Sequence, residues 1–177
     1  VENANYTFVL PSANFTWHFT DQLQLRAGAA KTMARPSVDK LAPTNTTASV
    51  SWGEFTQVYG GNVDLKPYSA AQADLSLEYY FAEHSIANVA VFYKRIKNQI
   101  TTSWEPGQDI GVPGYLFNVM RPINGDHAKV KGLELGLQHF WDNGFGVRGQ
   151  YTRNLSSSWV EGEKRPLEGI APATYSL

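Results

Sequence analysis

Residues 130–152 read VKGLELGLQHFWDNGFGVRGQYT, and this stretch decides the predicted fold. Leu133, Leu135 and Leu137 occupy alternate positions, with polar or small residues between them. Because successive strand side chains point to opposite faces, this alternation predicts a β-strand with one apolar and one polar side. Asn143-Gly144 accepts the positive φ angles of a tight turn, and the alternation resumes after it. The stretch therefore predicts a β-hairpin.

Two similar hairpins precede this one, and long polar segments separate the three. The hairpins cover about residues 6–35, 70–101 and 127–156, and the polar segments cover about residues 36–69, 102–126 and 156–172. Ala173-Thr174-Tyr175 begins another alternating run. We therefore predict an all-β fold, an antiparallel up-and-down meander of about six strands plus the start of a seventh. Near Arg95-Ile96 both faces carry apolar residues, which favours a β-bulge there.

Aromatic residues gather beside the short turns. They are Trp17, Phe19, Tyr79, Phe81, Trp141 and Phe145. Aromatic residues are common in strands of any kind. However, their position at one end of the strands favours an aromatic girdle, because amphipathic rings prefer the headgroup level of a membrane.

Charged residues occupy the polar sides of the predicted strands. They are Arg26, Asp74, Glu78, Glu134 and Arg148. A small barrel or a sandwich would fill that side with packed core residues, so the charges indicate a wide interior that is wet or plugged. Short turns that alternate with long loops, together with the aromatic girdle, are typical of a transmembrane β-barrel. We expect these five residues to face its lumen.

Composition and motifs exclude several other classes of protein. The formal net charge is −1, which gives no electrostatic argument for a nucleic-acid partner. Cysteine is absent, the four histidines show no metal-ligand spacing, and neither a Ser-His-Asp arrangement nor a G-x-S-x-G turn is found. The sequence therefore predicts no catalytic residues, no metal site and no cofactor.

Several motifs, in their order and separation, resemble the C-terminal β-barrel of TonB-dependent outer-membrane receptors. They are Val9-Leu10-Pro11-Ser12-Ala13-Asn14, Lys31-Thr32-Met33-Ala34-Arg35-Pro36, Gly61-Asn62-Val63-Asp64-Leu65-Lys66-Pro67, Val91-Phe92-Tyr93-Lys94 and Val130-Lys131-Gly132-Leu133-Glu134. The resemblance covers nearly the whole chain and is closest to the carbohydrate-uptake branch, although the siderophore branch shares much of it. Val63 and Tyr68-Ser69 depart from the pattern, which affects loop detail only.

The resemblance implies an active importer in the bacterial outer membrane. Residues 1–177 would be a single incomplete segment of a barrel of ~22 strands, because about six strands cannot close a barrel. Its expected partners are outer-membrane lipid, the plug domain and remaining strands of the same chain, the inner-membrane TonB complex and a small-molecule ligand. The short turns would face the periplasm, and the long segments would be extracellular.

Ligand would then meet the outer loops. The candidate residues are Trp52, Phe55 and Tyr59 in the first loop, Trp104, Tyr115 and Phe117 in the second, and Trp159 in the third. Aromatic faces suit sugar rings, and hydroxyl partners are available in Glu54, Gln57, Glu105 and Gln108. The alternative interpretation is that these rings form an outer girdle or pack the loops together.

Two other functions stay open at the level of sequence. A soluble β-sandwich that binds glycans would bury one strand face in a packed core and would have no use for an aromatic belt at a single end. An outer-membrane enzyme on a barrel scaffold would need a catalytic set of residues, which the sequence does not offer.

Overall fold

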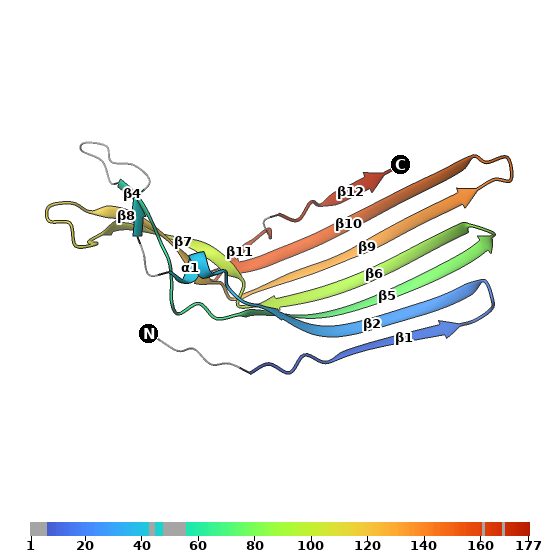
Figure 1. The fold of residues 1–177 in the computed structure, drawn as a ribbon, viewed down its shortest axis with the longest axis horizontal. Helices are drawn as coiled ribbons and strands as arrows, with labels where there is room; N and C mark the ends of the chain where they lie inside the picture. Colours follow the sequence, from blue (N-terminus) through green and yellow to red (C-terminus); the bar gives the residue numbers. More distant parts are fainter. Residues whose placement is uncertain (1–6, 43–44, 48–55, 161, 168) are drawn as a thin grey trace.

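The computed structural model describes residues 7–42, 45–47, 56–160, 162–167 and 169–177. Within these ranges, twelve strands form two sheets, and one short helix lies between β2 and β3. The larger, which we call the long sheet, has the order β1-β2-β5-β6-β9-β10-β11, and β12 also pairs with β10 (Figure 1). Its strands are β1 Ser12–His18, β2 Leu23–Ala34, β5 Tyr68–Ala82, β6 Ser85–Lys97, β9 His127–Phe140, β10 Gly146–Val160, β11 Glu163–Arg165 and β12 Ala173–Ser176.

The long sheet confirms the predicted antiparallel meander. Six long strands follow one another through short turns or longer excursions, and β12 starts the next strand beside β10. In Figure 1 the short turns gather at one end of the sheet, and the second sheet projects from the other end. The apolar and polar positions of neighbouring strands stay in register over most of their length, because antiparallel partners share a face.

Two details of the predicted hairpins differ in the structure. In the Asn143-Gly144 turn only Gly144 has a positive φ (85°), and Asn143 instead accepts a hydrogen bond from the backbone N–H of Phe145 at 3.1 Å. The prediction of a bulge near Arg95-Ile96 is wrong, because both residues pair regularly with β5 and β9. The irregularity lies between Tyr79 and Ala82, beside the turn that contains His84 in a left-handed conformation.

The first two of the three long polar segments contain strands that the sequence did not predict. β3 (Asn45–Thr47) and β4 (Thr56–Gly60) come from the first, and β7 (Ile100–Gln108) and β8 (Phe117–Asn124) come from the second. Together they form a four-stranded sheet of order β3-β4-β8-β7, which we call the loop sheet. The first segment also contains the short helix α1 (Val38–Leu41).

The loop sheet has a small hydrophobic core. Val58, Phe117 and Val119 are buried there, and Ile110 packs against them. β4 and β8 pair in parallel, so that Val58 lies beside Val119. Because these strands come from different polar segments, the core fixes the two segments to each other.

Asparagine side chains join the loop sheet to the long sheet. Asn124, the last residue of β8, accepts a hydrogen bond from the backbone N–H of Lys66 (2.8 Å) and donates to the carbonyls of Lys66 and Asn98 (3.0 Å each). Asn62 donates to the carbonyl of Pro122 at 3.0 Å. The motif Gly61–Pro67 therefore forms this junction, and its glycine is required because a Cβ there would lie 1.9 Å from the backbone oxygen of Ala42.

Asn124→Ala should loosen this junction without unfolding the long sheet. The change removes three hydrogen bonds and leaves the backbone groups of Lys66 without their side-chain partner, a loss of about 1–3 kcal/mol. We expect faster amide hydrogen exchange at Lys66 and along β8, with unchanged exchange in β9. Gln108→Ala is the control, because its side chain contacts only the nearby carbonyl of Pro106, at 3.5 Å. Equal exchange in the two variants would contradict the role of Asn124.

Candidate functional site

The long sheet has one continuous apolar side. Cross-strand pairing aligns one row from β1 to β12, consisting of Trp17, Leu25, Leu77, Val89, Leu135, Tyr151 and Tyr175. Leu135 in the middle of this row is 43% exposed. Among the described residues, no second layer of protein packs over this side, since the loop sheet extends from the end of the long sheet (Figure 1). The apolar side therefore lacks the covering layer that a sandwich would need.

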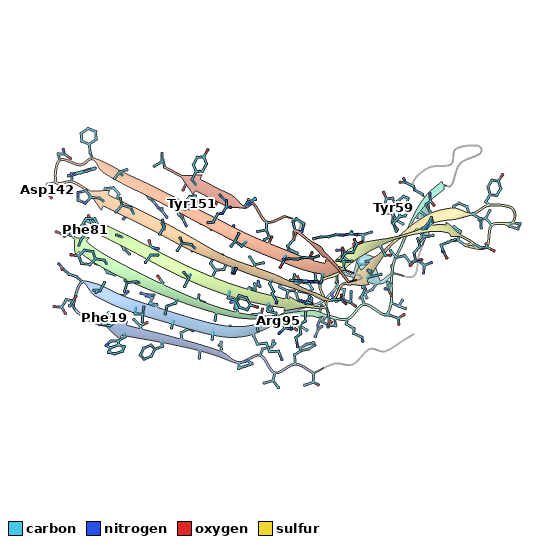
Figure 2. The ribbon with its side chains drawn as sticks, turned by 180° about the vertical axis from the view of Figure 1, so that it is seen from behind. Phe19, Tyr59, Phe81, Arg95, Asp142 and Tyr151 are labelled. Atoms are coloured by element: carbon cyan, nitrogen blue, oxygen red, sulfur yellow. The ribbon has the colours of Figure 1, made fainter. Side chains whose placement is uncertain are left out.

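The predicted girdle residues lie together at the turn end of the strands. Trp17 stacks on Phe19 with ring centroids 5.2 Å apart, and Tyr79 lies 6.0 Å from Phe81. Figure 2 shows Phe19, Phe81 and Asp142 at this same end of the sheet. Trp141 and the strongly exposed Phe145 flank the β9–β10 turn.

The sequence analysis missed His139, which completes the row of rings. Its ring lies 5.5 Å from Phe81 and 4.5 Å from Trp141, and its Nδ1 is 2.8 Å from the hydroxyl oxygen of Ser85. Because His139 is two residues before Trp141, the alternation of β9 places both side chains on the same side of the sheet.

The other side of the long sheet carries a polar network centred on Glu78. The carboxylate of Glu78 lies 3.3 Å from Arg26 Nε and accepts hydrogen bonds from Gln24 (2.6 Å) and from the hydroxyl of Tyr80 (2.8 Å). Asp74 lies four residues before Glu78 on the same side of β5, across from Gly28. Gln24 and Tyr80 were not among the predicted lumen-facing residues, although their alternate spacing with Arg26 and Glu78 places them on the same face.

Glycines on this polar side make space for side chains of the neighbouring strand. A Cβ at Gly28 would lie 2.7 Å from the carboxylate of Asp74, and one at Gly132 would lie 2.5 Å from the ring of Phe92. Glu134 and Arg148 belong to the same side, since Glu134 pairs with Ala90 and Arg148 pairs with Gln138. All five residues predicted to face a lumen thus share one side of the sheet.

The loop sheet brings two of the predicted ligand-binding aromatics together. Met120 of β8 pairs with Tyr59 on one side and with Trp104 on the other, so the three side chains share one face of the loop sheet. Tyr59 and Trp104 are 48% and 47% exposed. Gln57 and Asn118 form the neighbouring pair on that face. Figure 2 shows Tyr59 projecting from the loop sheet, far from the short turns.

The remaining candidates lie elsewhere. Phe117 is 6% exposed in the core of the loop sheet, a position that favours the loop-packing interpretation for this residue. Glu105 pairs with Val119 on the core side, whereas Gln108 and Tyr115 are exposed near the tip. Trp52, Glu54 and Phe55 lie outside the described residues.

Trp159 is separated from the loop-sheet face. It is near the end of β10, stacks on His127 with centroids 4.4 Å apart, and has the amines of Lys129 and Lys164 within 5.6 Å of its ring centroid. Its partner in the register is His127, which places it on the apolar side of the long sheet. This position favours the outer-girdle interpretation of Trp159.

The described residues contain neither a membrane-spanning helix nor a cluster of metal ligands. None of the described helices is both long and apolar enough to cross a bilayer. Within the described ranges, no three residues of His, Asp or Glu come together as ligands for a metal ion.

Comparison with known proteins connects this geometry to one family. The family described as "TonB dependent receptor-like, beta-barrel" matches residues 1–177. No curated protein matches the chain in sequence. Among solved structures, the siderophore receptor PirA from Pseudomonas aeruginosa matches with a TM-score of 0.70 and 20% identity, over 84% of this chain and 28% of PirA.

Two further structures have the same arrangement of strands. The ferric enterobactin receptor PfeA from Pseudomonas aeruginosa, in complex with BCV-L6, has a TM-score of 0.68 and 25% identity over 82% of this chain and 22% of its own. The Serratia marcescens hemophore receptor HasR, in complex with its hemophore HasA and heme, has a TM-score of 0.65 and 18% identity over 94% of this chain and 27% of its own. The chain thus spans about a quarter of the length of these structures.

Proposed function

The chain belongs to the TonB-dependent receptor-like β-barrels of the bacterial outer membrane, and we propose that it is one segment of a receptor that imports a scarce nutrient, a carbohydrate or a siderophore. The observation that carries this proposal is the division of the long sheet into an uncovered apolar side and a side with Arg26, Glu78 and Glu134. Lipid tails would cover the first side, and an aqueous or plugged lumen would hydrate the second. The solved relatives are receptors, which supports transport rather than catalysis.

We propose that the rest of a barrel of ~22 strands completes this segment. β1 forms one edge of the long sheet, and β11 and β12, which both pair with β10, form the other. The free edges of these strands would expose backbone N–H and C=O groups in lipid. Additional strands on both edges would satisfy these groups. The plug domain of the same chain would fill the lumen, with the short turns facing the periplasm and the inner-membrane TonB complex supplying energy.

The loop-sheet face of Tyr59, Met120 and Trp104 is the proposed contact for ligand. Two exposed rings on one face suit the flat apolar surface of a sugar or of an aromatic iron chelator. Gln57 on the same face supplies a donor and an acceptor for hydroxyl groups. Both ligand classes fit this chemistry, and the choice between them is made by binding measurements.

Trp104→Ala in the full-length receptor should weaken binding of the imported ligand about tenfold, because an aromatic contact contributes roughly 1 kcal/mol or more. The measurement is calorimetric titration with a panel of oligosaccharides and ferric chelates. Tyr175→Ala is the control, because it removes an exposed aromatic ring from the long sheet, away from the loop-sheet face. If Tyr175→Ala weakened ligand binding as much as Trp104→Ala, the proposed contact would be contradicted. If the receptor bound no compound of either class, the proposed import would be contradicted.

A further inference from the structure

The apolar side of the long sheet carries a group of cations at the end far from the short turns. We call it the basic belt, and it consists of Lys31, Arg95, Lys97, Lys129, Lys131 and Arg153. The register places these residues among the apolar ones, because Lys131 pairs with Tyr93 and Arg153 pairs with Leu133. Figure 2 labels Arg95 near the end of the long sheet that meets the loop sheet.

Within the described strands that carry the belt, no acidic residue lies on the same side of the sheet. In β2, β5, β6, β9 and β10 the acidic residues are Asp74, Glu78 and Glu134, and all three lie on the polar side. None of the ion pairs found among the described residues includes a belt cation. The charge of this surface is therefore purely positive along these strands.

The pairing inside the belt places like charges side by side. Arg95 and Lys129 are direct cross-strand partners, and like charges in that arrangement repel. Lys131 follows on the same side of β9, two positions along the strand. Three cations on adjacent positions with no protein carboxylate among them match a ligand that carries several negative charges.

The belt lies about one membrane thickness away from the aromatic girdle. Ser85 contacts His139, which lies beside the girdle residues Phe81 and Trp141. Arg95 lies ten residues after Ser85 on β6. At ~3.3 Å per residue and a strand tilt of ~40°, that separation is ~25 Å along the membrane normal, the height of the apolar band of a membrane barrel. With the short turns in the periplasm, as proposed above, the belt lies at the outer leaflet.

An apolar groove begins beside the belt. It has a volume of about 560 Å³, and its walls include Leu75, Val91, Tyr93, Leu133 and Leu155. Lys131 and Arg153 also line it, so cationic groups and apolar walls meet at one place. Asp74 is the one acidic residue of the lining, and its position in the register belongs to the polar side of β5. Such a surface suits a molecule with an acyl chain attached to an anionic headgroup.

We propose that the basic belt binds a phosphorylated glycolipid of the outer leaflet. Its phosphate groups contact Arg95, Lys129 and Lys131, and one acyl chain occupies the groove between Tyr93 and Leu155. The assignment of the belt to the outer leaflet rests on the proposed orientation of the receptor. The lipid would neutralise the repulsion within the belt and hold the long sheet at a fixed depth in the membrane.

The experiment uses the full-length receptor, purified in neutral detergent and titrated with diphosphorylated lipid A, with bound lipid counted by native mass spectrometry. Arg95→Gln combined with Lys131→Gln should weaken binding about 25-fold, because each cation near an anionic surface contributes about a factor of five. Lys40→Gln combined with Lys94→Gln removes the same charge away from the belt and should leave lipid binding unchanged. Arg95→Lys combined with Lys131→Arg should retain binding, and the heat-dependent gel mobility of each variant reports whether its barrel has folded.

Three results would overturn the proposal. The first is equal binding of lipid A by the belt variants and the control variants. The second is binding of fully dephosphorylated lipid A to the wild-type receptor as tightly as the diphosphorylated form. The third is complete displacement of the lipid by inorganic phosphate. Nutrient binding is measured on the same variants. The belt variants should keep it, and its absence in every variant, including the wild type, would contradict the import function and leave the result for the lipid intact.

Discussion

Leu135→Arg should lower the free energy of unfolding of the full-length receptor in lipid by about 2–4 kcal/mol, the cost of an arginine on the lipid side near the bilayer midplane. Leu135 lies in the middle of the apolar row, between Val89 of β6 and Tyr151 of β10. The aromatic girdle lies toward one end of its strand and the basic belt toward the other. The guanidinium group therefore has a long path to either interface, and its desolvation is not offset by a nearby acid.

The neighbouring position supplies the control for this substitution. Glu134→Gln changes a charge on the polar side of the same strand and should cost far less. Thr152→Arg places the same arginine opposite Glu134, where the lumen hydrates it. Urea titrations in lipid vesicles measure all three variants. Equal losses for Leu135→Arg and Thr152→Arg would mean that the two sides of the sheet have been assigned wrongly.

Phe117→Ala should unfold the loop sheet while the long sheet stays intact. Removing a buried phenylalanine costs roughly 3–5 kcal/mol through lost apolar contact and the cavity left behind. The core of the loop sheet contains few other buried residues, chiefly Val58 and Val119, so it has little to replace the lost packing. We expect amide exchange to approach the unfolded rate in β4 and β8, and the apparent affinity for ligand to fall with the population of the folded loop sheet.

Tyr115→Ala is the control for this second prediction, because its ring is 56% exposed near the tip of the same hairpin. Exchange in β9 and β10 should remain slow in both variants, since those strands pair with each other over their whole length. Protection of β4 in Phe117→Ala at the wild-type level would show that the small core does not stabilise the loop sheet.

The long sheet was predictable because each of its strands carries its own signal. Leu133, Leu135 and Leu137 define a face without reference to any other strand, and the neighbouring strands repeat the pattern in register. The same alternation, continued beyond residue 156, would also have placed Trp159 on the apolar side with Tyr151 and Leu155. His139 follows the same rule, because it alternates with Leu135 and Leu137 and therefore lies on the same side of the strand.

The loop sheet was not predictable in this way because its signal is not local. β4 has only five residues, β8 contains Pro122, and their pairing is parallel between two separate polar segments. A polar segment with scattered aromatics gives no indication of which ring is buried, so Phe117 was grouped with exposed rings such as Tyr115. The distinction arises from contacts between Val58 and Val119, which are distant in sequence.

The parallel pairing of β4 with β8 has a consequence for receptor engineering. A chimera could take only one of the two segments, residues 36–69 or residues 102–126, from a relative. The transplanted strand, β4 or β8, would then pair with a strand of different sequence from the recipient. The donor and recipient halves would then have unmatched hydrogen-bonding registers and unmatched core residues. Exchanging residues 36–69 and 102–126 as a single cassette preserves both, so the modular unit for changing specificity is the pair.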